Sequence, residues 1–134
     1  MQTIIIISTD PRIAAVKEQI QPLIIAKITI SPDFETGLAA IFRKMPEAVF
    51  LQQKINGIRA ERVTRHVRSL LQANSPVFIP LGSDAANDLE GIDSGSVIDL
   101  ALPVDQLVDA FKTQIRKIPL IRWKELAPRK TVGA

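Results

Sequence analysis

The sequence predicts a three-layer α/β sandwich in which one five-stranded parallel sheet lies between two layers of helices. Five short aliphatic runs alternate along the chain with five segments in which apolar residues recur at helical spacing. The connections between them are short, and short strand-to-helix connections produce parallel strands with right-handed crossovers. The 134 residues are enough for one hydrophobic core but too few for two comfortable ones.

The first two strand–helix units lie before Pro46. Ile4 to Ile7 is a continuous β-branched run, typical of a strand buried on both faces. The Ser-Thr-Asp-Pro turn after it predicts a helix start, and we expect that helix to run roughly from Pro11 to Gln21. Leu23 to Ile30 predicts the second strand, and apolar residues along one face predict a second helix that Pro46 ends.

The third and fourth strands are also aliphatic. Ala48 to Leu51 predicts the third strand, and an amphipathic helix is expected to start near Arg59. Val77 to Leu81 predicts the fourth strand. Pro80 inside it indicates distortion near the strand's end, because proline cannot donate a ladder hydrogen bond.

The last unit follows a polar, acidic stretch from Gly82 to Gly95, in which we expect only a weak helix. Ser96 to Ala101 predicts the fifth strand, and a clear amphipathic helix follows. We place the domain at residues 1–117 and a basic tail or linker at residues 118–134. This tail has three open interpretations: a linker, a docking peptide, or a segment that packs Leu120, Ile121 and Trp123 on the domain.

Composition excludes several kinds of site. The chain has no cysteine, which excludes disulfides, thiolate nucleophiles and cysteine-ligated metals, and His66 cannot build a metal site by itself. No glycine-rich phosphate loop follows the first strand, and no catalytic residue types cluster. We therefore expect no catalytic residue, metal or cofactor. The apolar run at the N-terminus is too short for a signal peptide or membrane span, so we expect a cytoplasmic protein.

Four segments, taken in order and at family spacing, resemble the receiver domains of two-component response regulators, of which the chemotaxis receivers are examples. These segments are residues 4–12, 46–52, 75–79 and 102–107, and the resemblance covers roughly Thr3 to Lys117. It implies a flavodoxin-like fold of five strand–helix units with strand order 2-1-3-4-5. In such folds, ligands sit at the carboxyl ends of the strands.

The sequence departs from the family at every phosphorylation position. Ser8 and Thr9 stand where the family holds Mg²⁺ with two adjacent carboxylates. Gln52 stands at the phospho-accepting Asp position, and its neutral amide cannot form an acyl phosphate. Leu81 and Leu102 replace the switch hydroxyl and the phosphate-binding lysine. The resemblance therefore implies a degenerate phosphorylation site.

Two neighbouring residues are expected to have structural roles. Asp10 is the only acid near Ser8 and Thr9, and we interpret it as a helix N-cap, with a weak residual metal or anion site as the alternative. The peptide bond before Pro103 is a candidate cis-proline, because the corresponding Lys-Pro bond of the family is cis.

The family also uses the face around its fourth and fifth helices for two-fold dimerisation. Here the acids Asp84 and Asp88 precede the last strand, and the bases Lys112 and Arg116 lie on the last helix. These complementary charges indicate a homodimer or a protein partner at this face.

We therefore expect a phosphorylation-independent pseudo-receiver that acts in signal transduction by binding a protein partner or a second copy of itself. One alternative is a small-ligand or nucleotide-binding α/β domain that uses the strand ends directly. Another is a nucleic-acid-binding module that uses the tail and the arginines at 59, 62, 65 and 68. A solvated helix face is the more ordinary interpretation of these arginines, so we do not expect nucleic-acid or membrane partners.

Overall fold

The computed structural model describes residues 2–82 and 97–124, and it confirms the predicted five-stranded parallel sheet. The strand order is β2-β1-β3-β6-β7, which is the expected 2-1-3-4-5 order when the strands of this sheet are counted along the chain. The sheet strands are β1 (Thr3–Ile7), β2 (Lys27–Ser31), β3 (Ala48–Gln52), β6 (Val77–Gly82) and β7 (Ile98–Asp99). The fold is thus flavodoxin-like.

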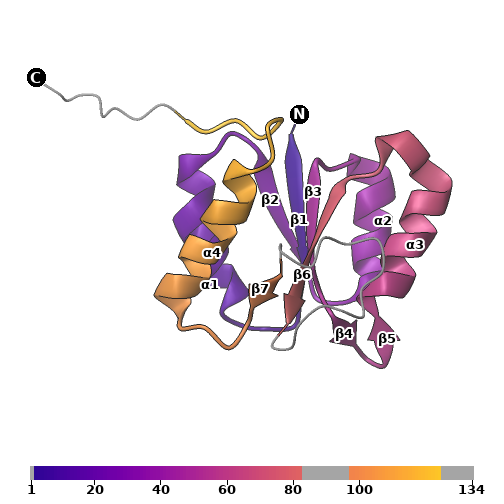
Figure 1. The fold of residues 1–134 in the computed structure, drawn as a ribbon, viewed down its shortest axis with the longest axis horizontal. Coiled ribbons are helices and arrows are strands. Elements are labelled where there is room, and N and C mark those ends of the chain that lie inside the picture. Colours follow the sequence, from indigo (N-terminus) through magenta and orange to yellow (C-terminus); the bar gives the residue numbers. More distant parts are fainter. Residues whose placement is uncertain (1, 83–96, 125–134) are drawn as a thin grey trace, which may run out of the picture.

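Within the described residues, four α-helices cover the two faces of this sheet. They are α1 (Ile13–Ile20), α2 (Phe34–Lys44), α3 (Ala60–Leu71) and α4 (Val104–Arg116). Figure 1 shows α1 and α4 on one face and α2 and α3 on the other. Two short 3₁₀ helices, Gln21–Leu23 and Gln72–Asn74, follow α1 and α3.

The four isoleucines of β1 divide between two cores. Ile4 and Ile6 belong to the cluster under α1 and α4, whereas Ile5 and Ile7 belong to the cluster under α2 and α3. All four are at most 2% exposed, because side chains alternate between the faces of a strand and both faces are covered here. On the first face, the rings of Phe50 and Phe111 lie 4.7 Å apart and fix α4 against β3.

Several predicted boundaries are wrong. Helix α1 begins at Ile13 rather than Pro11, because Pro11 and Arg12 form a turn. The fifth strand contains only Ile98 and Asp99, since a turn follows in which the Asp99 carboxylate accepts a bond from the Ala101 N–H at 2.8 Å. The weak helix expected within residues 84–89 lies outside the described residues.

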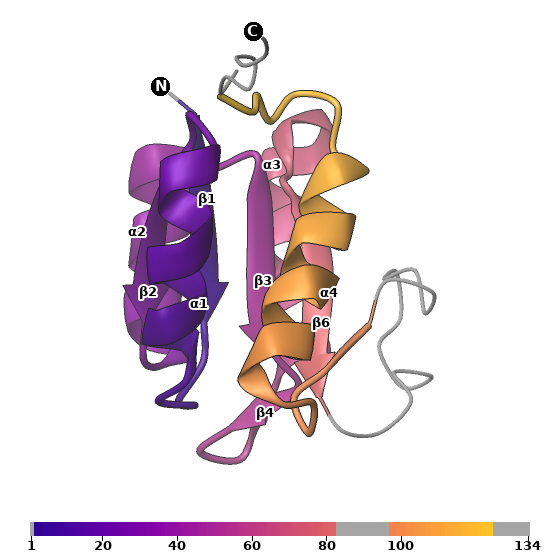
Figure 2. The ribbon, with the colours of Figure 1, turned by 90° about the vertical axis from the view of Figure 1, so that its left-hand side faces the viewer.

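A small antiparallel hairpin lies between β3 and α3 and was not predicted. It consists of β4 (Lys54–Ile55) and β5 (Ile58–Arg59), joined by Asn56 and Gly57. Both turn residues have positive φ, 51° and 81°, which matches the requirement of a two-residue hairpin turn. The hairpin lies at the carboxyl-terminal end of the sheet (Figures 1 and 2).

The chain after α4 packs on the domain as far as Lys124. Ile118 and Ile121 are 6% and 4% exposed and belong to the core under α1 and α4. Trp123 forms an antiparallel bridge with Ile24, and the Arg116 guanidinium lies 4.9 Å from the centre of its ring. The packing therefore continues past residue 117, where we placed the end of the domain. Leu120, by contrast, is 67% exposed.

None of the helices in the described ranges has the length and apolar character needed to span a bilayer.

Candidate functional site

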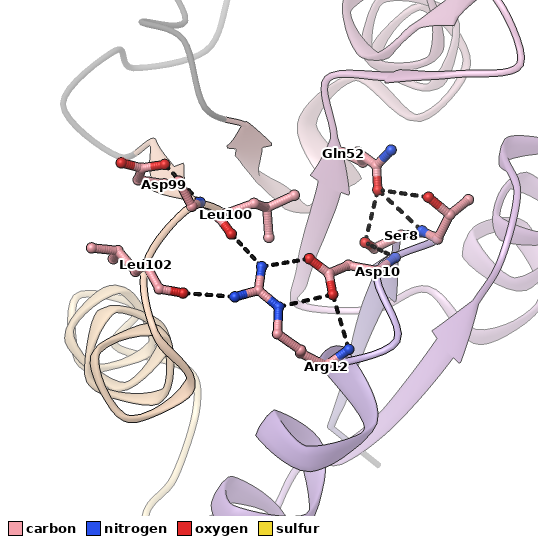
Figure 3. A network of polar contacts seen from close by, with 9 residues as sticks. Ser8, Asp10, Arg12, Gln52, Asp99, Leu100 and Leu102 are labelled. Atoms are coloured by element: carbon pink, nitrogen blue, oxygen red, sulfur yellow. Dashed lines mark hydrogen bonds and ion pairs between the residues drawn. The ribbon is translucent and has the colours of Figure 1, made fainter.

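The residues at the expected phosphorylation positions meet at the carboxyl ends of β1 and β3. Ser8 and Thr9 follow β1, and Gln52 is the last residue of β3. Because these strands are parallel neighbours, with Ile7 opposite Leu51, the residues that follow them converge at one edge of the sheet. Figure 3 shows the resulting network of polar contacts.

The amide oxygen of Gln52 accepts hydrogen bonds from both residues after β1. The donors are Ser8 Oγ at 2.9 Å, the Thr9 backbone N–H at 3.0 Å and Thr9 Oγ1 at 3.3 Å. Its amide nitrogen donates to the Lys54 carbonyl at 3.1 Å. The lone pairs of this oxygen are therefore occupied by the chain's own donors.

Ser8 connects this network to the next turn. Its side chain is buried, and its hydroxyl oxygen also accepts a bond from the Asp10 backbone N–H at 3.0 Å. A buried hydroxyl that donates once and accepts once has its hydrogen-bonding requirement met without an ion. The structure thus brings Ser8, Thr9 and Gln52 together as a neutral hydrogen-bonded cluster.

Asp10 pairs with Arg12 instead of capping α1. Its carboxylate accepts bonds from Arg12 Nη2 at 2.7 Å, from Nε at 3.1 Å and from the Arg12 backbone N–H at 2.9 Å. The N-cap of α1 is Arg12, which makes no side-chain capping bond, so the prediction that Asp10 is the N-cap is wrong. The Pro-Arg turn places Arg12 where its guanidinium attracts the carboxylate.

The charge of this pair is stabilised locally. Hydrogen bonding from the Arg12 side chain lowers the pKa of Asp10 below its usual value, and this effect outweighs partial burial, which raises it. The same ion pair raises the pKa of Arg12. The negative charge of Asp10 is therefore favoured, and both oxygens of its carboxylate accept hydrogen bonds from Arg12.

Arg12 also reaches across to the turn between β7 and α4. Its Nη1 donates to the Leu102 carbonyl at 2.7 Å, and its Nη2 donates to the Leu100 carbonyl (Figure 3). One guanidinium thus joins the turn after β1 to the turn after β7. We call this arrangement of Asp10, Arg12 and the two carbonyls the Arg12 clamp.

Leu81 and Leu102 take no part in the polar network through their side chains. Leu81 is fully buried in the core under α1 and α4, and the partly buried Leu102 packs against the same core. Their side chains therefore extend the apolar core at this end of the sheet.

The Leu102–Pro103 peptide bond is trans, since the described residues contain no cis peptide bond. The cis-proline suggested by the family resemblance is therefore wrong. The trans form is the ordinary preference of an X-Pro bond, and here it is the Leu102 carbonyl that receives the Arg12 side chain.

A shallow pocket of about 380 Å³ lies beside this network. It is lined by Gln52, Gln53, Lys54, Leu81, Gly82, Leu100 and Ala101. Gly82 gives room to the Gln53 side chain, because a Cβ at Gly82 would clash with Gln53 Oε1. Among the described residues of this lining, only Lys54 is ionisable. Within the described parts of the chain, no three potential metal ligands of the His, Cys, Asp or Glu types form a group.

The predicted interaction residues are only partly described. Asp84 and Asp88 lie outside the described residues, whereas Lys112 is half-buried on α4 and Arg116 stacks on Trp123. On α3, the Glu61 carboxylate pairs with Arg59 and Arg65, each at 3.2 Å. The arginine-rich face of α3 therefore contains internal ion pairs.

The fold resembles those of solved receiver domains. A chemotaxis response regulator of Vibrio cholerae superposes with a TM-score of 0.67 at 10% identity, covering 85% of this chain and 98% of that one. The signal receiver domain of an HD domain-containing protein from Pseudomonas fluorescens superposes with a TM-score of 0.65 at 14% identity, covering 88% of this chain and 89% of that one. A two-component transcriptional regulator from Clostridium phytofermentans superposes with a TM-score of 0.66 at 11% identity, covering 89% of this chain and 95% of that one.

No protein-family model and no curated protein sequence matches the chain. The structural similarity, at these low identities, shows that the chain has the receiver fold.

Proposed function

We propose that this domain is a phosphorylation-independent pseudo-receiver, a cytoplasmic signalling domain that binds a protein partner or a second copy of itself and catalyses no reaction. The observation that carries this proposal is the hydrogen bonding of Gln52. At the position where a receiver has its phospho-accepting Asp, a neutral amide oxygen accepts bonds from Ser8 and Thr9. An amide oxygen cannot act as the carboxylate nucleophile that forms an acyl phosphate.

The surroundings of Gln52 support the same proposal. Mg²⁺ prefers octahedral oxygen ligands and is usually held by one or two carboxylates. Ser8 and Thr9 supply none, and the nearby Asp10 carboxylate is engaged by Arg12 in a 2.7 Å ion pair. A phosphoryl group and its metal would have to displace both sets of contacts.

The Arg12 clamp supports a domain with one preferred state. A conformational switch needs a ligand that binds one state of a two-state element more tightly than the other. In this chain, the Arg12 side chain donates hydrogen bonds to the Leu100 and Leu102 carbonyls in the turn before α4. The face that includes α4 is then available to a partner without prior phosphorylation.

Incubation with Mg²⁺ and acetyl phosphate, a small phosphoryl donor, tests the proposal by intact-protein mass spectrometry. We expect no phosphoryl adduct, while an ordinary receiver domain treated in parallel becomes phosphorylated. The Gln52→Asp variant should also remain unmodified, because Ser8 and Thr9 still provide no carboxylate for the metal. A stable adduct on the unaltered chain would contradict the proposal.

The oligomeric state is tested separately by light scattering over a concentration series. A monomer–dimer transition that Arg116→Glu weakens would favour self-association through the α4 face. A chain that stays monomeric at all concentrations would leave a different protein as the partner.

A further inference from the structure

The turn that joins β4 to β5 consists of Asn56 and Gly57, and both residues are exposed (Figure 1). Of the three asparagines in the sequence, only Asn56 is followed by glycine. Ile55 and Ile58 pair across the turn, so the hairpin ladder is made by the residues that flank it. The Gly57 nitrogen donates no backbone hydrogen bond to any described residue. A peptide nitrogen beside an asparagine side chain is thus left outside the ladder.

No described side chain crowds this nitrogen. A Cβ placed at Gly57 would meet no described atom within 4 Å. Glycine itself has no side chain and has the widest main-chain freedom of any residue. The Asn56 side chain can therefore approach the Gly57 nitrogen without displacing a neighbour.

The hairpin is fixed at its base and weakly held at its turn. The Ala60 N–H donates to the Gln53 carbonyl at 2.8 Å, and Ile55 packs in the core under α2 and α3. Beyond this base each strand has only two residues, and Ile58 is 42% exposed. A two-stranded hairpin of this size is marginally stable, so the turn can open locally while the domain stays folded. Opening gives the turn the main-chain freedom that a ring closure needs.

We propose that Asn56 is a site of spontaneous deamidation, in which the turn reacts with itself and then with water. The Gly57 nitrogen attacks the side-chain carbonyl carbon of Asn56 and forms a bond to it. The bond from that carbon to the side-chain nitrogen breaks, and ammonia leaves with the proton that the Gly57 nitrogen has lost. The product is a five-membered succinimide ring, and water is the only further reactant.

Water opens the ring at either of its two carbonyl groups. Opening at the former side-chain carbonyl gives aspartate, whereas opening at the main-chain carbonyl gives isoaspartate, in which the main chain continues through the side chain. Either product adds a carboxylate to the hairpin. Isoaspartate also lengthens the turn, so Ile55 and Ile58 lose the register that a two-residue connection gives them.

The modified turn lies next to the Gln52 network. The Lys54 carbonyl, in the first strand of the hairpin, accepts a hydrogen bond from the Gln52 side-chain nitrogen at 3.1 Å. A change of register in the hairpin therefore moves an acceptor of Gln52. This inference goes beyond the proposed function and does not depend on it.

Prolonged incubation of the folded full chain at neutral pH tests the inference, with intact-protein mass spectrometry followed by peptide mapping. We expect the mass gain of an amide that becomes a carboxylate, located at Asn56 and present partly as isoaspartate. The rate should lie within about tenfold of that of a synthetic peptide of residues 52–61, because so short a hairpin opens at little cost in free energy. The NMR signals of the Gln52 side-chain amide should shift in the isoaspartate form. Asn56→Gln, whose longer side chain disfavours the ring, should show no gain at this position.

Asn74 is the internal control, because it is also exposed but is followed by serine. It should stay unmodified over the same time. Equal conversion of Asn56 and Asn74 would overturn the inference, as would an intact Asn56 in the folded chain under conditions in which the peptide converts. Conversion that requires urea would overturn it too, because the hairpin would then not open in the folded domain. None of these results involves a partner protein or a phosphoryl group, so they leave the tests of the proposed function independent.

Discussion

The Nη1 atom of Arg12 donates a hydrogen bond to the carbonyl oxygen of Leu102 at 2.7 Å, although the two residues are 90 positions apart in the sequence. This contact joins the turn after the first strand of the sheet to the turn that precedes the last helix. Asp10 holds the guanidinium in place from the other side. A single side chain therefore ties together the two loops between which a phosphorylation site would lie.

Replacement of Arg12 by alanine should loosen the turn before α4. The carbonyls of Leu100 and Leu102 lose their donor, and we expect faster hydrogen exchange in residues 100–104 together with a lower melting temperature. Arg12→Lys should restore only part of the exchange protection and of the melting temperature, because an ammonium group cannot reproduce the planar fork of donors of a guanidinium. Arg62→Ala, on an exposed part of α3, is the matched control and should leave exchange in these residues unchanged. If both alanine variants behaved alike, the clamp would have no structural role.

Replacement of Gln52 by alanine should destabilise the domain by about 1–2 kcal/mol, because the buried Ser8 hydroxyl loses the acceptor that it bonds at 2.9 Å. Urea denaturation followed by Trp123 fluorescence measures this change. Gln19→Ala removes the same side chain from an exposed position on α1 and should change the free energy of unfolding by less than about 0.5 kcal/mol. Equal stability of the two variants would show that the Gln52 network contributes nothing.

The contribution of Asp10 to stability should depend on pH. Its pKa in the folded protein is lowered by the Arg12 hydrogen bond, so it stabilises the fold fully above its ordinary pKa. This stabilisation is lost as the pH falls through the lowered pKa of the folded state. Asp10→Asn should therefore cost about 1 kcal/mol at neutral pH, a value reduced by the partial exposure of the pair.

Urea denaturation at a series of acidic and neutral pH values measures this dependence for the unaltered chain and for the Asp10→Asn variant. The difference between their free energies of unfolding should be constant near neutral pH and should shrink in acid. Asp33, whose pKa is lowered by the Thr36 backbone N–H, titrates in both chains, so the difference between the two curves isolates Asp10. A difference that grew on acidification would have the wrong sign for this account.

Truncation after Lys117 should destabilise the domain strongly. It removes Ile118 and Ile121, which are 6% and 4% exposed, and each buried isoleucine side chain contributes about 1.5–3 kcal/mol. We therefore expect a loss of about 3 kcal/mol or more, or failure to fold, as measured by urea denaturation with circular dichroism. Truncation after Lys124 keeps this packing and is the control. A fully stable chain ending at Lys117 would show that residues 118–124 belong to a separate tail.

The sheet could be predicted from the sequence because its signal is local. Four consecutive isoleucines require burial on both faces of a strand, and the short links between the aliphatic runs then fix a parallel sheet. The meeting of Ser8 and Gln52 follows from the strand order, since β1 and β3 are neighbours. The hairpin was missed because each of its strands has only two residues, although Asn56-Gly57 is a strong hairpin-turn signal.

The Arg12 clamp could not be predicted in the same way. The acceptors of Arg12 are backbone carbonyls, and every residue has one, so the sequence contains no pattern that selects Leu100 and Leu102. The contact depends on how the turn before α4 lies against the turn after β1. The packing of Ile121 and Trp123 was left open for a similar reason, because a short irregular segment has no periodicity to show which side chains are buried.

The most direct test of the account is an amide NMR titration with Mg²⁺ and then with Mg²⁺ plus beryllofluoride, a mimic of the phosphoryl group. The account predicts that the amides of residues 8–10, Gln52 and residues 100–102 do not shift, because Gln52 and Arg12 already occupy this site with the chain's own contacts. Saturable shifts at these residues would contradict it, and would mean that the site still binds a phosphoryl group and its metal.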